Sequence, residues 1–419
     1  MSAATTPLSG EEFEIMEQLL WMERPSRHEL AGRSGYSKSK VASIVGRLLE
    51  DQWLEEGEYH ESSGGRRPGS LRLSRDLGYV VGIDLGATSI DLALCDASLN
   101  VLGTRTAATN VMLGPGPVLA QIAALLDDLL GSHGAPYDRV LGLGLGVPGP
   151  VEFGTGLLIN PPLMPRWEGF NLREHFAALL DAPLAVDNDV NLMALGELHH
   201  ARRSGLSGGG ENFLVVKLGT GIGCGIVAQG DVFRGADGSA GDIGHICVEP
   251  DGPRCHCGNL GCLEALAGAP NIAREAAQAA GSGDSPILAE LAAQHSPLGT
   301  REVAQAARLG DPVANDIVQT AGSRVGQVLA GLVNFFNPSQ ILLGGGVAQM
   351  GPLMLASVRQ SVYARSLPLS TRKLRIDSTR LQDTSGLRGA CVLALRHALA
   401  GRRHPAAPGQ SCRVVRGEA

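Results

Sequence analysis

The chain of 419 residues contains no run of about 18 apolar residues, because glycines and charged side chains interrupt every candidate span. Its first residues, Met-Ser-Ala-Ala-Thr-Thr-Pro, lack the basic and apolar regions of a secretory signal peptide. Most of its eight cysteines are scattered, unlike the disulfide framework of a small secreted domain. The scattered ones are Cys95, Cys224, Cys247, Cys391 and Cys412. We therefore expect a cytoplasmic protein without a membrane partner.

An overall positive charge is also absent, since the formal net charge is -7. This excludes a protein that is coated uniformly by nucleic acid, so any DNA contact must come from a local basic patch. The length predicts two or three folding units, and a hydrophobic content of 44% is enough to build their cores.

The cysteines that do cluster lie between Gly241 and Glu264, in the order Gly-Asp-Ile-Gly-His, nine residues, Cys-His-Cys-Gly-Asn-Leu-Gly-Cys-Leu-Glu. Three thiolates and one imidazole suit a tetrahedral structural zinc ion, and four protein ligands leave no open position for chemistry. The predicted ligands are His245, Cys255, Cys257 and Cys262. Four unrelated residues in one loop are the simpler alternative. A zinc-bound loop would aim Asp242 and Glu264, in the same segment, at a ligand.

The first 75 residues predict a winged helix-turn-helix. Ser9 with Glu12 and Ser26 with Glu29 have the spacing of capping boxes, so each pair predicts the start of a helix. We expect a turn at Gly32–Gly35 and a third helix from Ser37 to about Asp51. Its outward residues are candidates to contact DNA: Lys38, Ser39, Lys40, Ser43 and Arg47.

A small hairpin follows, with Trp53–Tyr59 and Leu71–Leu73 as its expected strands. The connection between them carries Arg66 and Arg67 among glycines and a proline, a basic tip able to reach a phosphate or a minor groove. Basic residues thus coincide with the elements that should touch double-stranded DNA. An amphipathic three-helix docking module is the alternative.

From Tyr79 the pattern changes to alternating strands and helices. Two strand–glycine turn–strand units predict a duplicated α/β core with a nucleotide between its lobes; a third glycine cluster follows a later strand. In the first unit the acidic residue would hold Mg²⁺, and the glycine would let backbone N–H groups approach the phosphates of ATP. Each cluster alone is equally typical of an ordinary turn. The candidate nucleotide residues are Asp84, Gly86, Thr88, Gly219, Thr220, Gly221, Gly344, Gly345 and Gly346.

Asp189, with Asn188 beside it, ends one strand and leads into a helix. Phosphoryl transfer to a sugar hydroxyl needs a base near the acceptor, so Asp189 is the candidate general base. A helix N-cap is the alternative, since Asp and Asn favour that position.

Together these motifs resemble the ROK family, which groups bacterial repressors, uncharacterised reading frames and sugar kinases. Gly142–Pro150 looks like the family's sugar-side loop, Val186–Glu197 like its catalytic segment, and Gly241–Glu264 like its zinc-containing signature. The resemblance covers nearly the whole chain: residues 79–400 match the kinase-like lobes, and the repressors carry a similar winged helix. It implies an actin-like, hexokinase-type pair of lobes with a hinge near residues 186–200.

The resemblance also implies that the lobes bind a sugar through Gly149, Asn188, Asp189, Asp242, His245 and Glu264. His245 is thereby assigned both to zinc and to sugar. Two residues depart from the kinases of the family. Asp242 replaces their usual glutamate, which withdraws the carboxylate by about 1.5 Å. Ala87 replaces a glycine in the first phosphate turn, which disfavours ATP.

The sequence thus predicts a sugar-responsive transcriptional regulator, a repressor, whose lobes bind a sugar or sugar derivative and control operator binding. The alternative is an ATP-dependent sugar kinase, or a regulator that keeps residual kinase activity. Palindromic operators favour a homodimer, or a homotetramer built from two. Residues 401–419 are rich in Pro, Gly, Arg and Ala, which predicts a disordered tail.

Overall fold

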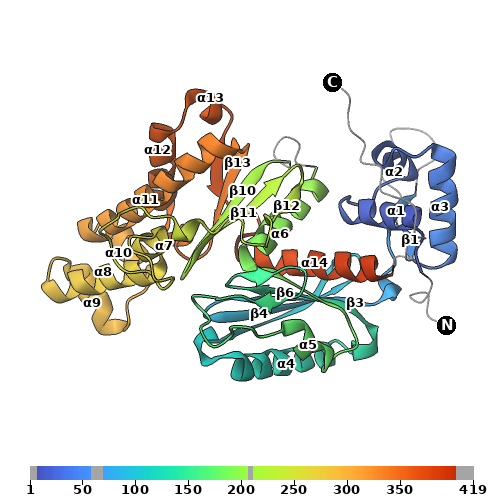
Figure 1. Ribbon diagram of the computed structural model, residues 1–419, viewed down its shortest axis with the longest axis horizontal. Helices are drawn as coiled ribbons and strands as arrows, with labels where there is room; N and C mark the ends of the chain where they lie inside the picture. The colour runs from blue at the N-terminus through green and yellow to red at the C-terminus, as the bar shows by residue number, and fades with distance from the viewer. Residues whose placement is uncertain (1–6, 58–68, 206–210, 403–419) are drawn as a thin grey trace.

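The computed structural model describes residues 7–57, 69–205 and 211–402. A small helical unit lies at one end of the molecule, followed by two α/β lobes (Figure 1). Arg66, Arg67 and the predicted tail beyond Arg402 lie outside the described residues, while Gly401 still belongs to the last helix. No helix within the described ranges is long and apolar enough to cross a membrane.

The N-terminal unit has the three helices and the two-stranded ladder of a winged helix. They are α1 (Gly10–Leu20), α2 (Arg27–Ser34), α3 (Lys38–Glu50), β1 (Leu54–Gly57) and β2 (Ser70–Leu73). Both predicted capping boxes are present, at Ser9 with Glu12 and at Ser26 with Glu29. The turn comes later than predicted, because α2 continues to Ser34. It ends at Gly35, whose φ of +71° is left-handed and favours glycine.

Lobe one is built on a five-stranded sheet of order β5-β4-β3-β6-β9. The strands are β3 (Tyr79–Leu85), β4 (Ser89–Asp96), β5 (Val101–Ala108), β6 (Val140–Val147) and β9 (Leu184–Asn188). Alternate residues of β3 face opposite layers: Val81 and Ile83 belong to one core cluster, and Val80 to another. The first cluster includes α4 (Pro115–Ser132) and α5 (Leu172–Ala177), and the second includes α14 (Ser385–Gly401). A short hairpin, β7 (Val151–Glu152) with β8 (Leu157–Leu158), completes the lobe.

Lobe two repeats the connectivity with the order β12-β11-β10-β13-β14. In each lobe three consecutive antiparallel strands are joined by two parallel ones, which confirms the predicted duplication. Its strands are β10 (Phe213–Leu218), β11 (Ile222–Ala228), β12 (Asp231–Phe233), β13 (Gln340–Gly344) and β14 (Arg375–Ser378). Its helices are α7 (Leu263–Ala267), α8 (Ala269–Ser282), α9 (Pro286–Gln294), α10 (Thr300–Arg308), α11 (Pro312–Phe336), α12 (Pro352–Arg365) and α13 (Pro368–Thr371).

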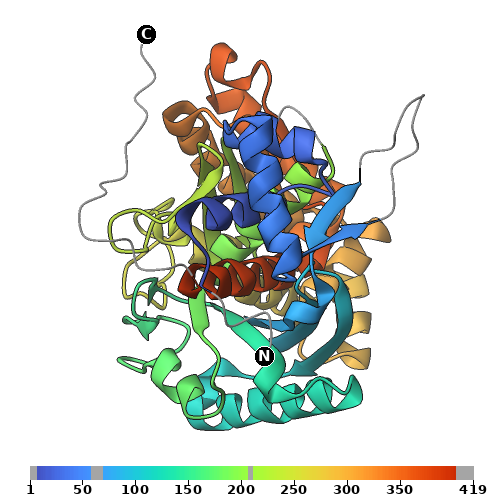
Figure 2. The same cartoon turned by 90° about the vertical axis from the view of Figure 1, so that its right-hand side faces the viewer.

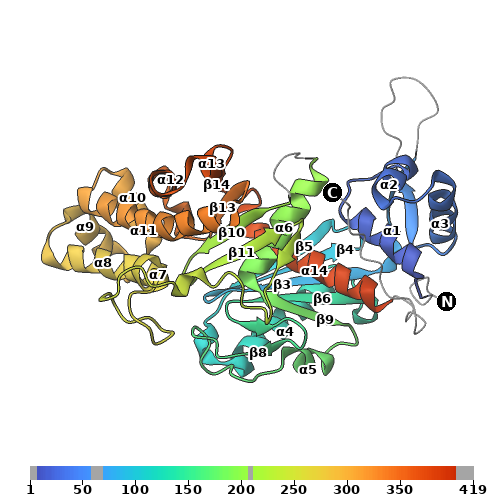
Figure 3. The ribbon, with the colours of Figure 1, turned by 45° about the horizontal axis from the view of Figure 1, so that its top comes forward.

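Two helices, α6 (Asp189–Arg203) and α14, cross each other between the sheets (Figure 3). They approach so closely that a Cβ on Gly389 would lie 1.8 Å from the Leu192 carbonyl oxygen. Several polar residues of α6 are buried here, although Arg202 and Arg203 near its end are only partly buried. The carboxylate of Glu197 accepts hydrogen bonds from the backbone N–H groups of Arg380 and Leu381. Helix α6 is therefore buried over most of its length.

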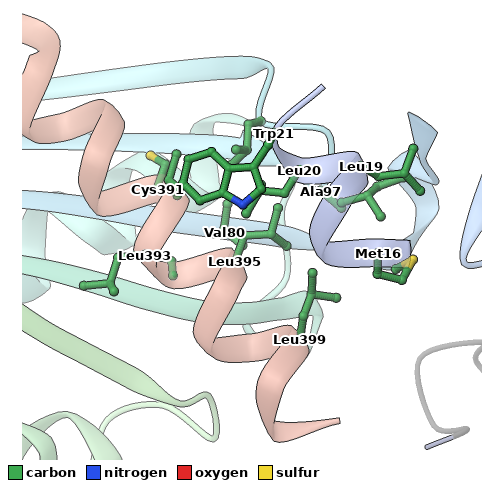
Figure 4. Packing of buried hydrophobic residues seen from close by; sticks show 14 of the residues in the cluster. Met16, Leu19, Leu20, Trp21, Val80, Ala97, Cys391, Leu393, Leu395 and Leu399 are labelled. Atoms are coloured by element: carbon green, nitrogen blue, oxygen red, sulfur yellow. The ribbon is translucent and has the colours of Figure 1, made fainter. Parts of the chain in front are cut away.

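The winged helix is docked on this pair of helices. It stands in front of α14 in the view of Figure 2. Leu20, Trp21 and other residues of its first helical segment share one hydrophobic cluster with Leu395 and Leu399 of α14 (Figure 4). An ion pair between Glu17 and Arg396, 3.1 Å long, borders this contact. The winged-helix unit therefore shares its core with the lobes rather than being joined to them only by a linker.

Two strand boundaries differ from the sequence prediction. The run of glycines from Leu218 to Gly225 predicts a turn followed by a strand from Ile226, but β11 begins at Ile222 and the turn is limited to Gly219–Gly221. Gly344 is the last residue of β13 and pairs with Lys217, so it is not part of the third turn. Long glycine runs look like turns in a sequence, yet glycine also fits a strand against which a helix packs closely.

Candidate functional site

The described residues enclose a cavity of about 420 Å³ between the two lobes. All six residues predicted to bind sugar line it: Gly149, Asn188, Asp189, Asp242, His245 and Glu264. Seven of the predicted nucleotide residues line it as well: Gly86, Thr88, Gly219, Thr220, Gly221, Gly345 and Gly346. Asp84 and Gly344 are not among the lining residues. Asp84 lies beneath the cavity against α14, where a Cβ on Gly386 would be 2.2 Å from its Oδ2.

The four predicted zinc ligands meet at one side of this cavity. Their ligand atoms all lie within 4.8 Å of one another. Cys257 Sγ is 3.7 Å from Cys262 Sγ, and Cys255 Sγ is 3.6 Å from His245 Nδ1. A tetrahedral zinc ion with bonds of about 2.3 Å to sulfur requires ligand separations of about 3.8 Å. The cluster therefore has the composition and the size of a structural zinc site.

The orientation of His245 separates its two predicted roles. Its Nδ1 faces Cys255, whereas its Nε2 lies 3.9 Å from Asp242 Oδ1. Metal coordination at Nδ1 would leave the proton on Nε2 and make that nitrogen a hydrogen-bond donor. One imidazole can thus serve the metal and a ligand in the cavity through different nitrogens.

Glu264 is brought to the cavity by the same segment. Cys262 immediately precedes α7, and Glu264 lies in the first turn of that helix. Its Oε2 accepts a hydrogen bond of 3.0 Å from the backbone N–H of Ile222, and only 8% of its surface is exposed. Burial raises the pKa of this carboxyl despite that hydrogen bond. The Cys/His cluster and Ile222 therefore fix Glu264 from two directions.

The N-cap position at the start of α6 is occupied by Asn188 rather than by Asp189. Asn188 is the N-cap of α6: its Oδ1 accepts from the backbone N–H of Val190 at 3.0 Å. Its Nδ2 donates to the Gly149 carbonyl oxygen at 3.1 Å. Asp189 is the first residue of the helix, with its side chain free of capping duty.

Lys217, which belongs to none of the sequence motifs, forms an ion pair with Asp189. Its Nζ lies 2.6 Å from Asp189 Oδ2, and the lysine side chain is 26% exposed. Burial lowers the pKa of Lys217, but Asp189 and Asp84 raise it by more, so the ammonium is charged. Lys217 is the second-last residue of an apolar strand, and strand periodicity predicts only which face it occupies.

Asp84 is the other acidic group near this lysine. Its Oδ1 is buried and has no hydrogen-bond partner among the residues described. Burial raises the pKa of its carboxyl to about 6, and the charge of Lys217 opposes that rise. An unpartnered carboxylate oxygen is an unusual feature of a protein interior and is typical of a functional site.

The outward face of α3 carries the predicted DNA contacts. Lys38, Ser39 and Ser43 are exposed. Lys40 pairs with Glu11 of α1 at 2.6 Å, and Arg47 pairs with Glu12 at 2.9 Å. Ion pairs at such solvent-exposed positions contribute little stability, so a phosphate can displace the carboxylates.

Residues 80–397 match the sequence profile of the ROK family, and the chain therefore belongs to this family. It is 35% identical over 291 residues to a glucokinase of Halalkalibacterium halodurans, covering 69% of this chain and 87% of that protein. It is 28% identical over 383 residues to the xylose repressor of Caldicellulosiruptor bescii, covering 91% of this chain and 94% of the repressor.

Solved structures show the same two kinds of similarity. A ROK family transcriptional regulator, a homologue of the Escherichia coli MLC protein, superimposes with a TM-score of 0.76 at 26% identity, covering 93% of this chain and 96% of its own. A glucokinase from Streptomyces griseus in complex with glucose and AMPPNP gives a TM-score of 0.66 at 30% identity, covering 76% and 99%. The fold is therefore a winged helix followed by the two-lobed kinase-like fold.

Proposed function

We propose that this protein is a cytoplasmic sugar-responsive transcriptional repressor, in which a sugar bound between the lobes controls DNA binding by the winged helix. Helix α6 carries the proposal. Asn188 and Asp189 at its start line the cavity, while His199 and Arg202 near its end contact the winged helix. The helix has 15 residues, a length of about 22 Å. Because most of its residues are buried, movement at one end is transmitted to the other.

The division into parts follows from this reading. Residues 1–75 form the DNA-binding domain, residues 79–400 bind the sugar, and the lobes close about a hinge within residues 186–200, where β9 ends and α6 begins. A ligand shifts such an equilibrium only through different affinities for its two states. The relatives named as repressors support this reading, because their similarity extends over nine-tenths of the chain: 91% for the xylose repressor.

In this proposal the sugar hydroxyls contact the polar residues of the cavity, namely Asn188, Asp189, Asp242, His245 and Glu264, with Gly149 lining the pocket. One structural zinc ion held by His245, Cys255, Cys257 and Cys262 keeps Glu264 in place. The winged helix contacts operator DNA through α3, with Arg66 and Arg67 as further contacts. A homodimer or homotetramer reads a two-fold symmetric operator.

ATP-dependent phosphorylation of a sugar is the second candidate function. It is favoured by Asp189, which shares the cavity with the turn Gly219–Gly221, and by the similarity to glucokinases. The carboxylates of Asp84 and Asp189 are the oxygen donors that Mg²⁺ prefers. Lys217 is already paired with one of them and disfavours this function.

A thermal-unfolding screen with xylose, glucose and N-acetylglucosamine tests the sugar site. We expect one class of sugar to raise the melting temperature of the wild type and to have no effect on Asn188→Ala. Asn171→Ala is the matched control: Asn171 also caps a helix, α5, but is not among the residues that line the cavity. The control should keep the response to sugar.

The stabilising sugar is then added to complexes with operator fragments selected from random duplexes. We expect it to weaken DNA binding by about tenfold, which corresponds to ordinary allosteric coupling. Sugar binding that leaves DNA affinity unchanged would contradict the proposal. Release of ADP from ATP and Mg²⁺ with that sugar, lost in Asp189→Asn, would establish the second function instead.

A further inference from the structure

We propose that Lys217 acts as an internal cation that takes the place of Mg²⁺ beside Asp84 and Asp189, so that the cavity binds a sugar without binding magnesium nucleotide productively. The inference rests on the proposed sensor function and assigns Lys217 the role that separates sensing from phosphoryl transfer. Lys217 is therefore a specificity-determining residue of the cavity.

The sheet of lobe two leaves space for the side chain of Lys217, because both residues paired with it are glycines. In the ladder Lys217 is paired with Gly223 of β11 on one side and with Gly344 of β13 on the other. Directly paired residues point to the same face of a sheet, so the lysine has no side chain beside it on either neighbouring strand. That face is turned toward α6, since a Cβ on Gly344 would meet Met193 at 2.6 Å.

From there the side chain reaches across to the start of α6. Its Nζ lies 2.6 Å from Asp189 Oδ2, a short charge-assisted hydrogen bond. Asp189 is 7% exposed, so the pair is largely shielded from water and is stronger than one at the surface. A residue of lobe two is thereby bonded to the residue at which α6 begins.

Asp84, on β3 of lobe one, contributes the second negative charge. Its Oδ1 has no hydrogen-bond partner in the part of the chain that the structure describes. An acidic pair of this kind attracts a hard divalent cation with oxygen ligands and waters. The ammonium of Lys217, bonded to Asp189, supplies one positive charge that also acts electrostatically on Asp84, and it would repel a second cation brought beside it.

The same contact occupies the candidate base. Phosphoryl transfer requires the sugar oxygen to bond to the γ-phosphorus of ATP while its proton passes to Asp189. The bond from that phosphorus to the β,γ-bridging oxygen then breaks and releases ADP. A base must lie within hydrogen-bond reach of the proton it accepts. Asp189 Oδ2 is already bonded to Lys217. Among the residues that the structure describes, no hydrogen bond or ion pair joins that ammonium to the other polar residues of the cavity, which stay available to the sugar: Asn188, Asp242, His245 and Glu264.

Lys217→Met tests the inference, because methionine keeps an unbranched stem and removes the charge. Lys217→Arg is the matched control that keeps it. Affinity for AMPPNP is measured by calorimetry with and without Mg²⁺ in the full-length protein, and sugar affinity is measured in parallel. We expect Lys217→Met to bind Mg²⁺-AMPPNP at least about tenfold more tightly than the wild type, and Lys217→Arg to resemble the wild type.

Equal affinity of the wild type and Lys217→Met for Mg²⁺-AMPPNP would overturn the inference, as would sugar-dependent release of ADP by the wild type. Failure of any sugar to bind the wild type would instead overturn the proposed sensor function, so the two outcomes are distinct. Should Lys217→Met unfold at the assay temperature, Lys217→Gln carries the same test with a polar end that can still hydrogen-bond to Asp189.

Discussion

The two ends of α6 have different surroundings. At the start of the helix, Asn188 and Asp189 face a cavity and are joined to their neighbours by hydrogen bonds and one ion pair. Near its end, His199 and Arg202 pack on the winged helix: the imidazole of His199 donates to the Leu20 carbonyl oxygen at 3.1 Å. The guanidinium of Arg202 lies 4.6 Å from the centre of the Trp21 ring.

The two ends of α6 are therefore suited to different tasks, one to ligand response and the other to attachment of the winged helix. Polar contacts beside a cavity can be exchanged for contacts with a ligand, because the net contribution of one hydrogen bond is only about 1 kcal/mol. A buried aromatic side chain contributes several times more. The cavity end can therefore respond to a ligand while the other end keeps the DNA-binding domain attached.

The largest effect on stability is expected beside the cavity, from loss of the zinc ion proposed to bind the Cys/His cluster. Cys262→Ser should lower the zinc content from about one ion per chain to nearly none, and should reduce the free energy of unfolding by about 5 kcal/mol. Metal analysis and chemical unfolding measure both quantities. Cys247→Ser is the control, because Cys247 is exposed and lies outside the cluster. A folded Cys262→Ser variant that still responds to sugar would contradict the role given to the metal.

At the opposite end, Trp21→Ala should cost about 3–5 kcal/mol, because the ring is 6% exposed and packs in the shared core. The lobes should still bind sugar, so thermal stabilisation by the sugar should persist while its effect on DNA binding disappears. Phe335→Ala, at a side chain that is 90% exposed, is the control and should change neither property.

The pH dependence of the free energy of unfolding reports on the end of α6 that packs on the winged helix. Burial lowers the pKa of His199 to about 2, against about 6.5 in an unfolded chain. The unfolded state therefore takes up this proton below about pH 6.5 and the folded state does not. Above that pH this histidine does not reduce the free energy of unfolding. As the pH falls toward 2, protonation of the unfolded state reduces the free energy of unfolding progressively. Between pH 7 and pH 5 the wild type should lose about 2 kcal/mol through this group.

Urea unfolding at both pH values measures this loss. His199→Gln keeps a donor for Leu20 and removes the titrating ring, so its stability should depend less on pH than that of the wild type. Identical pH dependence in the two proteins would show that His199 does not report on this interface.

The smallest effect on stability is expected on the DNA face. Lys38→Ala should change the free energy of unfolding by less than about 0.5 kcal/mol, since the side chain is exposed. It should weaken DNA binding of any sequence and reduce the salt slope by about one. Fluorescence anisotropy at several salt concentrations measures the slope. Arg66→Ala with Arg67→Ala should reduce it further, and unchanged DNA affinity would exclude the basic tip from the interface.

Much of the local structure was predictable. The capping boxes at Ser9 and Ser26 and the strands of the duplicated core follow from spacing and periodicity over a few residues. The Cys/His cluster was predictable for the same reason: Cys255, Cys257 and Cys262 are close in sequence. The errors lie in glycine-containing segments: Gly32 belongs to α2 rather than to the turn, β11 begins already at Ile222, and Gly344 belongs to β13.

Local sequence patterns were thus enough to predict the order of the elements, the family and the residue types gathered around the cavity. Only the tertiary structure showed that Lys217 meets Asp189, 28 positions away, and that His199 meets Leu20, 179 positions away. Such contacts depend on how whole sheets and helices pack. The spacing of neighbouring residues carries no information about such contacts, because the sequence pattern of a strand or helix is the same whichever distant residue packs against it.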